Sequence, residues 1–212
     1  MTIGAGVKVK ICGITNLEDA LASLNAGCDA LGFAFFKKSP RYVTPEQAKQ
    51  IIEQLPASIV KIGVFVNAKE EAIKRIAKLC HLSMLQFHGN ESSKFCDKFK
   101  NYKIIKAFRI KDKIDPKSLL KYKTFAYLFD TFVASRSGGT GKTFNWKLVT
   151  HFADLKQPIF LAGGLNANNI KKAIRIARPD WVDACSSVEK SPGKKDHRKV
   201  REFIKAAKGK SP

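Results

Sequence analysis

Short β-rich runs alternate with helical segments eight times along the chain. This alternation constrains the fold more than any other feature, because strands separated by helices pair in parallel. The predicted strands are apolar on both faces, and eight such units in 212 residues fit a closed barrel better than an open sheet. We therefore predict an α/β protein, a single-domain (β/α)8 TIM barrel that spans residues 1–212. Its strands are predicted at 7–12, 29–35, 59–66, 84–87, 102–108, 125–129, 158–161 and 181–185.

Capping residues mark the predicted helix starts. Thr15 and Glu18 have the spacing of a capping box, and so do Thr44 and Gln47, where Pro45 occupies the first helical position. Four later helices are each predicted to begin after a single polar cap. These caps are Asn67, Asn90, Asn166 and Asp196.

The formal net charge of +21 raises the expectation of anionic ligands or polyanionic partners. The lysines are spread along the chain, however, mostly at predicted helix surfaces, and no basic–aromatic RNA-binding motif is present. The densest run, 194–210, carries apolar residues at helical spacing and is predicted to be the solvated face of a terminal helix. We expect no specific nucleic-acid partner, and only weak binding to polyanions at low salt.

The sequence carries no feature of a secretion signal or a membrane span. The longest apolar stretches, such as 62–66, are far too short to cross a bilayer. Residues 1–6 lack a basic region followed by an apolar core. We therefore expect a cytoplasmic protein with no membrane partner.

The cysteines are odd in number, and no pair has the spacing of a zinc site. We therefore expect no disulfide and no metal ion. Most of the thiols should be small buried hydrophobic groups. The five are Cys12, Cys28, Cys80, Cys96 and Cys185.

Polar side chains and glycines collect where the predicted strands end. The active site of such a barrel lies at the carboxyl ends of its strands, so these residues should surround one mouth. A thiol and a carboxyl there, Cys12 and Asp130, could act as base and acid in a proton transfer. Taken alone, Cys12 is more typical of a buried structural thiol, and His88 of a hydrogen-bonding neighbour of the site. The full set is Cys12, Arg41, His88, Arg109, Asp130, Gly163, Gly164, Asp183, Ser186 and Ser187.

Small residues follow the seventh and eighth predicted strands. Gly163 and Gly164 come after the seventh, and Ser186 and Ser187 after the eighth. Small side chains let backbone N–H groups approach an anion, and barrels often bind phosphate at these two loops. We therefore predict a phosphorylated small-molecule substrate, with a pair of ordinary turns as the alternative.

The glycine-rich segment 137–143 has the look of a phosphate-binding P-loop, but its spacing is wrong. The P-loop pattern requires glycine five residues before Gly141, where this chain has Arg136. The glycines also lie well past the end of the sixth predicted strand. A mobile loop that closes over the mouth fits better, with glycine hinges and with Lys142 available to an anion.

Together these motifs resemble the phosphoribosylanthranilate isomerase family of tryptophan biosynthesis. The similarity extends from about Val7 to Gly209. Its most specific parts are Lys10–Thr15, Gly138–Trp146 and Pro192–Asp196, which are typical of that family rather than of barrels in general. The other matching segments are Gly32–Phe35, Ser39–Tyr42, Gln86–Gly89, Phe129–Thr131, Leu161–Asn166 and Val182–Asp183.

The resemblance implies an Amadori rearrangement that needs no cofactor. N-(5-phosphoribosyl)anthranilate would become the corresponding 1-deoxyribulose 5-phosphate. By the same resemblance, Asp130 is the general acid on the ring oxygen and Cys12 is the general base on the C2′ proton. Arg41 would pair with the anthranilate carboxylate, and Asp183 would contact the sugar hydroxyls or support Asp130. The phosphate would be held by backbone groups around Gly163, Gly164, Ser186 and Ser187.

Two residues depart from the usual pattern of the family. Glycine usually follows two serines near the eighth strand, whereas this chain has Cys185, Ser186 and Ser187 in a row. The Cβ of Ser187 could tighten or displace the phosphate loop. Asn145 stands where aspartate is common, but the two residues cap helices about equally well.

Two other functions stay open at this point. The isomerase of histidine biosynthesis runs the same rearrangement on a similar barrel, but it uses aspartate at the end of the first strand, where this chain has Cys12. A non-catalytic barrel that binds polyanions is favoured by the net charge, while the intact set of Cys12, Asp130 and Arg41 argues against it. The resembled family includes monomers and homodimers, and the sequence does not decide between them.

Overall fold

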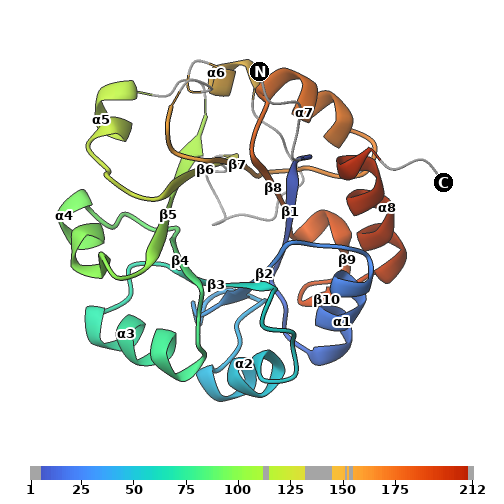
Figure 1. Cartoon of the computed structure of the whole chain (residues 1–212), viewed down its shortest axis with the longest axis horizontal. Helices are drawn as coiled ribbons and strands as arrows, with labels where there is room; N and C mark the ends of the chain where they lie inside the picture. The colour runs from blue at the N-terminus through green and yellow to red at the C-terminus, as the bar shows by residue number, and fades with distance from the viewer. Residues whose placement is uncertain (1–5, 112–114, 132–144, 151, 153–154, 210–212) are drawn as a thin grey trace.

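The computed structural model describes residues 6–111, 115–131, 145–150, 152 and 155–209. Eight parallel strands pair in chain order, and β8 closes the ring by pairing with β1. Figure 1 shows this ring with the helices arranged around its outside. The predicted (β/α)8 barrel is therefore confirmed. Its strands are β1 (Lys8–Cys12), β2 (Ala30–Ala34), β3 (Val60–Phe65), β4 (Met84–Phe87), β5 (Lys103–Ile110), β6 (Ala126–Thr131), β7 (Ile159–Leu161) and β8 (Trp181–Ala184).

The helices follow the strands in strict alternation, apart from a small hairpin after β8. That hairpin pairs β9 (Glu189–Ser191) with β10 (Lys194–Lys195) in antiparallel fashion, and it lies beside α1 and α8 (Figure 1). It was not predicted, because its strands are too short to show an apolar pattern. The helices are α1 (Leu17–Asn25), α2 (Pro45–Ile52), α3 (Glu70–Leu79), α4 (Ser93–Cys96), α5 (Pro116–Leu120), α6 (Lys147–Thr150), α7 (Ile170–Ala177) and α8 (His197–Lys208), with 3-10 turns η1 (Asp97–Phe99) and η2 (Ser186–Val188).

The core has two layers, because successive residues of a strand point to opposite faces. One layer lies between the strands and the helices, and Val9 and Ile11 of β1 belong to it. The other fills the barrel, where the rings of Phe160 and Trp181 stack with centroids 4.8 Å apart. The inner layer is therefore packed with side chains and leaves room for a ligand only at the strand ends. Its members are Ala30, Ile62, Met84, Ile105, Ala107, Ala126, Leu128, Phe160, Ala162 and Trp181.

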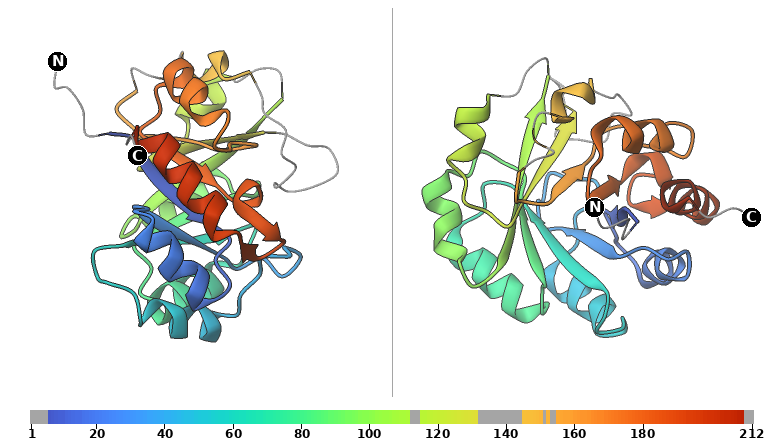
Figure 2. Two further views of the ribbon diagram at one scale, coloured as in Figure 1. Left: turned by 90° about the vertical axis from the view of Figure 1, so that its right-hand side faces the viewer. Right: turned by 45° about the horizontal axis from the view of Figure 1, so that its top comes forward.

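The predicted sixth strand is two residues too short. It was expected to end at Phe129, but β6 continues through Asp130 and Thr131, which pair with Arg109 and Ile110 of β5. The tilted view of Figure 2 shows β5 and β6 running side by side. Asp130 is thus held by the sheet itself, where a carboxylate would not be expected from strand propensity alone.

Two of the predicted helix caps are confirmed and one is wrong by a single residue. Thr44 and Gln47 form a reciprocal capping box, and Asp196 caps α8. At α1 the cap is Asn16, whose side chain accepts from the backbone N–H of Asp19. Thr15, predicted as that cap, instead donates its hydroxyl to the carbonyl of Gly193 in the hairpin.

The three predicted asparagine caps are also displaced along the chain. Asn67 and Asn90 do not begin helices, because the side chain of Asn67 accepts from the backbone N–H of Asn90 at 2.7 Å and joins two loops. The actual caps of α3 and α4 are Lys69 and Ser92. Asn166 organises a turn just before α7, whose first residue is preceded by Asn169.

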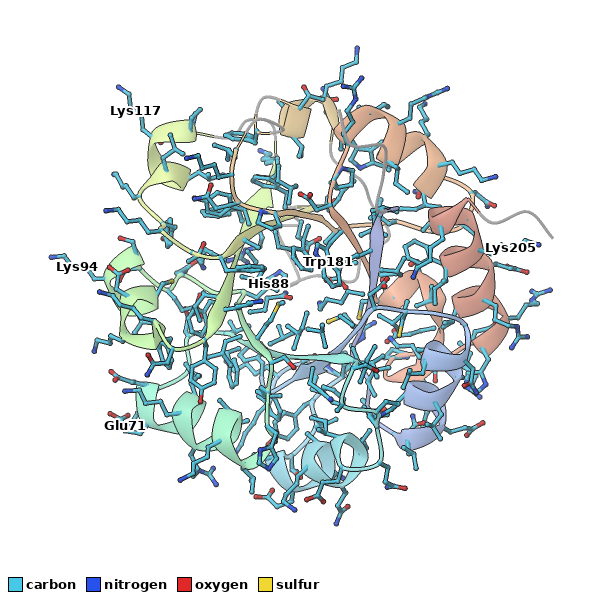
Figure 3. All side chains as sticks on the ribbon, viewed as in Figure 1. Glu71, His88, Lys94, Lys117, Trp181 and Lys205 are labelled. Carbon is cyan, nitrogen blue, oxygen red and sulfur yellow. The ribbon has the colours of Figure 1, made fainter. Side chains whose placement is uncertain are left out.

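Charged side chains extend outward from the helices. Figure 3 shows Glu71, Lys94, Lys117 and Lys205 pointing away from the barrel, whereas His88 lies inside it. This distribution matches a solvated surface more closely than a single basic groove. No helix in the described part of the chain combines the length and apolar character that crossing a membrane requires.

Candidate active site

One pocket at the carboxyl ends of the strands contains every residue that the sequence singled out for catalysis or substrate binding. It is open to solvent and is lined by both polar and apolar side chains. Arg109, also expected at the mouth, is not part of its lining; its side chain is exposed and lies 3.4 Å from the amide oxygen of Asn90. The predicted residues in the lining are Cys12, Arg41, His88, Asp130, Gly163, Gly164, Asp183, Ser186 and Ser187.

The Cys12 thiol ends β1 and is partly exposed in this pocket. Its pKa lies well below the ordinary value of a thiol, because the Cys185 thiol donates a hydrogen bond to it and the ammonium groups of Lys10 and Lys195 lie nearby. These contacts outweigh the desolvation that opposes ionisation. This environment therefore favours the thiolate of Cys12, and a thiolate is the form that accepts a proton.

Lys10 and Asp183 form a buried ion pair beneath Cys12. The two residues are in register on β1 and β8, and Nζ lies 2.6 Å from Oδ2. Burial disfavours the ammonium of Lys10, but Asp183 more than offsets it and keeps the pKa of Lys10 above its ordinary value. Burial raises the pKa of Asp183 to about 7, with Cys12 and Asp130 adding to the rise. Asp183 is thus electrostatically coupled to both predicted catalytic groups.

Asp130 is held by a backbone hydrogen bond and lies beside His88. Its Oδ1 accepts the backbone N–H of Thr131 at 2.7 Å, and its Oδ2 lies 3.2 Å from Nε2 of His88. The side-chain nitrogen of Gln86 lies 2.8 Å from Nδ1 of His88. With Gln86 as the donor, Nδ1 accepts and Nε2 carries the proton that faces Asp130. His88 therefore lies beside the carboxyl group, but its Nε2 has no hydrogen-bond partner among the described residues.

The loop after β7 approaches β6 so closely that only glycine fits. Gly163 has a φ of +85°, and a Cβ there would lie 2.5 Å from the backbone nitrogen of Thr131 and 2.8 Å from Oδ1 of Asp130. Gly164 also has a positive φ, of +66°. Both conformations favour glycine. Because Gly163 has no side chain, the backbone of this loop can lie directly against Asp130, the predicted acid.

Several buried polar atoms at the pocket lack a hydrogen-bond partner. Among the lining residues they are Oγ of Ser187, Oδ1 of Asp183, Oε1 of Gln86 and Nε2 of His88. Ser187 lies in η2, the single turn that follows β8, and it lines the same pocket as Gly163 and Gly164. Buried polar groups are normally satisfied, so these atoms indicate a polar ligand whose groups complete the network.

Arg41 reaches the pocket from the loop after β2, but its guanidinium is already engaged. Its Nη2 lies 2.7 Å from Oε2 of Glu189, and Nε also donates to that carboxylate. Burial opposes ionisation of Glu189, but the hydrogen bond from Arg41 and the charge of Lys195 keep the pKa of Glu189 below its ordinary value. Any carboxylate that Arg41 binds must therefore use the remaining N–H groups of its fork.

Sequence reasoning missed two lysines of the site. Lys10 was included in the first predicted strand but was given no role. The alternation of Lys8, Lys10 and Cys12 nevertheless places all three residues on one face of that strand. Lys195 was assigned to a solvated helix, but it is buried in β10 and its Nζ lies 2.6 Å from the carbonyl oxygen of Cys12. The alternation was a usable signal for Lys10; nothing in the local pattern distinguished Lys195 from its neighbours.

The remaining predictions about this site concern metals and the glycine-rich loop. Within the described ranges, no three His, Cys, Asp or Glu side chains gather as they would around a metal ion. The predicted loop at 137–143, with Lys142, lies outside the described residues.

A family model and curated proteins that are similar to this chain agree with each other. Residues 9–206 match the family described as N-(5′phosphoribosyl)anthranilate (PRA) isomerase. The N-(5′-phosphoribosyl)anthranilate isomerase of Thermotoga neapolitana is 50% identical over 204 residues, which cover 96% of this chain and 99% of that protein.

Solved structures agree in fold and in sequence. The phosphoribosyl anthranilate isomerase of Thermotoga maritima superposes with a TM-score of 0.91 at 44% identity, covering 96% of this chain and all of the other. A complex of such an isomerase with reduced 1-(o-carboxyphenylamino)-1-deoxyribulose 5-phosphate gives 0.87 at 42% identity, and so do monomers generated from the dimeric Thermotoga maritima enzyme. Both cover 96% of this chain and 100% of the other chain.

Proposed function

The chain belongs to the N-(5′-phosphoribosyl)anthranilate isomerase family, and from this premise we propose that Cys12 and Asp130 are its catalytic base and acid. The chain is an isomerase of tryptophan biosynthesis. It converts N-(5′-phosphoribosyl)anthranilate to 1-(2-carboxyphenylamino)-1-deoxyribulose 5-phosphate by an Amadori rearrangement. The reaction moves protons without a change in total redox state, so one acid and one base suffice and the proposed steps require no cofactor.

In the first proposed step, Asp130 donates a proton to the ring oxygen of the ribose. The C1′–O bond breaks as the anthranilate nitrogen forms a double bond to C1′, which opens the sugar to a protonated Schiff base. The hydrogen bond that Asp130 accepts from the Thr131 N–H supports this role, because it fixes the carboxyl group at the pocket wall. A fixed donor reduces the reorganisation that proton transfer requires.

In the second proposed step, the Cys12 thiolate removes the C2′ proton. The electrons of that C–H bond form the C1′–C2′ double bond of an enolamine, while the Schiff-base nitrogen becomes neutral. Tautomerisation of the enolamine then gives the C2′ ketone of the product. The low pKa of Cys12 supports this assignment, because the thiolate must be populated before the proton can move.

The proposed substrate contacts follow from the same pocket. Backbone groups of Gly163, Gly164 and Ser186 and the free hydroxyl of Ser187 would bind the phosphate. On the opposite part of the lining, Arg41 would receive the anthranilate carboxylate beside Glu189. His88 and Asp183 would contact the sugar between them, and the free Oδ1 of Asp183 is available to a hydroxyl group.

One observation carries this proposal: the Cys12 thiol, which accepts a hydrogen bond and lies near two ammonium groups, lines the same pocket as the carboxyl group of Asp130, which a backbone N–H holds in place. The test is a fluorescence assay that follows the loss of freshly made phosphoribosylanthranilate. Cys12→Ala and Asp130→Asn should each lower kcat by at least about 100-fold, the scale of acid–base catalysis.

Matched controls separate these roles from general damage. Cys28→Ala removes a buried thiol far from the pocket, and Asp97→Asn removes an exposed carboxylate. Both should keep the full rate. A Cys12→Ala enzyme with nearly the full rate would show that the thiol is not the base.

We further propose that the protein acts in the cytoplasm as a monomer or homodimer, without a specific nucleic-acid partner. A dimeric relative supports the second assembly, and the outward spread of lysines over many helices supports the absence of a nucleic-acid groove. Light scattering of the purified chain distinguishes the two assemblies. Retention of a labelled RNA at physiological salt would contradict the last part of the proposal.

A further inference from the structure

Cys12 is the last residue of β1, and Cys185 directly follows β8, the strand that pairs with β1. In the parallel pairing of β1 with β8, Lys10 is opposite Asp183 and Ile11 is opposite Ala184. Lys10 and Asp183 touch inside the barrel, and Cys12, two positions after Lys10 on β1, shares that inner face, while Cys185 is the second residue after Asp183. Both thiols line the pocket and are partly exposed to solvent.

The backbone around the two thiols is held in place by one buried ammonium group. Nζ of Lys195 lies 2.6 Å from the carbonyl oxygen of Cys12 and 3.4 Å from that of Cys185. Neighbouring strands are ~4.8 Å apart, which falls within the Cα separation of ~4.4–6.8 Å that disulfides span. The thiols already share a hydrogen bond, so joining them requires little backbone movement.

From this geometry we propose that Cys12 and Cys185 form a modification site, at which a hydroperoxide joins the two thiols in a disulfide. The inference rests on the proposed function in one respect: the disulfide stops catalysis because it removes the base. In the rearrangement Cys185 acts only through its hydrogen bond to Cys12. Its position beside the reactive thiol gives it a second role as the resolving cysteine.

The oxidation proceeds in two balanced steps. The Cys12 thiolate attacks one oxygen of hydrogen peroxide, the O–O bond breaks, and hydroxide leaves; sulfur is oxidised to the sulfenic acid as the peroxide is reduced. The Cys185 sulfur then attacks the Cys12 sulfur. The S–S bond forms, the S–O bond breaks, and the departing hydroxide takes the Cys185 proton to leave as water. A dithiol reverses the change by thiol–disulfide exchange.

The other three thiols are poor competitors for the oxidant. Burial raises the pKa of Cys28 to about 12, and burial raises those of Cys80 and Cys96 to about 11. All three are buried, whereas the Cys12–Cys185 pair is in the open pocket. Peroxide reactivity follows the amount of thiolate and its exposure, so oxidation should select the pair.

The test is peroxide treatment of the reduced enzyme, followed by alkylation, peptide mapping and the isomerase assay. The number of alkylated thiols should fall from five to three, and one cross-linked peptide should contain Cys12 and Cys185. Activity should fall by about 100-fold at full oxidation and return completely with dithiothreitol. Cys28→Ala, the matched control, should form the same cross-link.

The Cys185→Ser variant separates the disulfide from simple loss of the base. It should give no cross-linked peptide, and prolonged peroxide should carry Cys12 to the sulfinic acid, which dithiothreitol does not reduce. The inference is overturned if wild-type protein yields no Cys12–Cys185 peptide, or if both proteins recover activity equally. A cross-linked fraction that retained full activity would support the modification site and instead refute Cys12 as the base.

Discussion

Among the buried lysine–carboxylate pairs of the described residues, the Lys106–Glu91 and Lys10–Asp183 pairs differ in how fully they are hydrogen-bonded. Lys106 and Glu91 are packed outside the ring of strands. The ammonium of Lys106 lies 2.9 Å from Oε2 of Glu91, and it also donates to the carbonyl oxygens of Phe87 and Gly89 at 3.3 and 2.7 Å. Glu91 additionally accepts the backbone N–H of Asn67 at 2.7 Å.

The pair inside the barrel is incomplete by comparison. Lys10 contacts Asp183 at 2.6 Å and the Cys12 sulfur, while Oδ1 of Asp183 is buried with no partner. A saturated buried network rigidifies the structure, whereas an unsatisfied polar atom is costly and is retained where a ligand completes it. The outer pair therefore stabilises the loops after β3 and β4, and the inner pair prepares a binding site.

The largest effect that we expect is a loss of stability when the outer pair, Lys106 and Glu91, is broken. Glu91→Gln removes the charge that compensates a buried ammonium group, which costs about 3–5 kcal/mol. We expect the denaturation midpoint to fall while kcat of the folded enzyme is unchanged. Glu70→Gln, which breaks the exposed pairs with Lys74 and Lys98, is the control and should leave the midpoint nearly unchanged. A loss of kcat at full stability would place Glu91 in the active site and break the comparison.

The next effect is on the rate, at the inner pair. Lys10→Met removes the ammonium group beside the Cys12 thiolate, so we expect kcat/KM at neutral pH to fall by about 100-fold. Stability should change less than in Glu91→Gln, because Asp183 can take up a proton: burial already raises its pKa to about 7. Steady-state kinetics and denaturant unfolding of the same preparation measure both quantities. If Lys10→Met lost much of its stability but the folded enzyme kept its full rate, the roles assigned to the two pairs would be reversed.

The barrel was predictable because its determinants are local and repeated. Each strand is a short apolar run, and eight such runs separated by helices leave few alternative folds. The cap positions were less predictable, because several polar residues at each loop can accept the same backbone N–H. Thr15 and Asn67 show the reason: both are drawn away from helix starts by contacts with Gly193 and Asn90, which are distant in sequence.

The site was partly predictable for a related reason. Residues that end strands, such as Cys12 and Gly163, meet at one mouth in any barrel of this type. The charge environment of Cys12 was not predictable, because it depends on burial and on long-range contacts. Lys195 stabilises the Cys12 carbonyl from a position 183 residues further along the chain. The hydrogen bond from Cys185 likewise depends on the register of β1 with β8.

A smaller effect concerns Ser187, whose hydroxyl is unsatisfied like Oδ1 of Asp183. If the hydroxyl donates to the substrate phosphate, Ser187→Gly removes a hydrogen bond to a charged group, which is worth about 1.5 kcal/mol. KM should rise by about tenfold with kcat unchanged. Initial rates over a range of substrate concentrations measure this. A lower KM would show that the Cβ of Ser187 crowds the phosphate loop instead.

The smallest effect that we expect is a shift in the pH dependence of activity in Cys185→Ala. Cys185→Ala removes the thiol that donates to Cys12, so the pKa of Cys12 should rise toward its ordinary value. The thiolate is the active form and is lost as pH falls through this pKa. The acid limb of the profile of kcat/KM against pH should therefore move to higher pH, while the rate at alkaline pH stays the same.

A serine at position 185 keeps a hydroxyl donor. In Cys185→Ser the acid limb should therefore return at least part of the way to its position in the unmodified enzyme. Cys28→Ala controls for the loss of a buried sulfur and should leave the profile unmoved. If the limb stays in place in Cys185→Ala, it reports a different group. Asp183 is then the group to examine, because burial raises its pKa to about 7 and it would titrate over the same pH range.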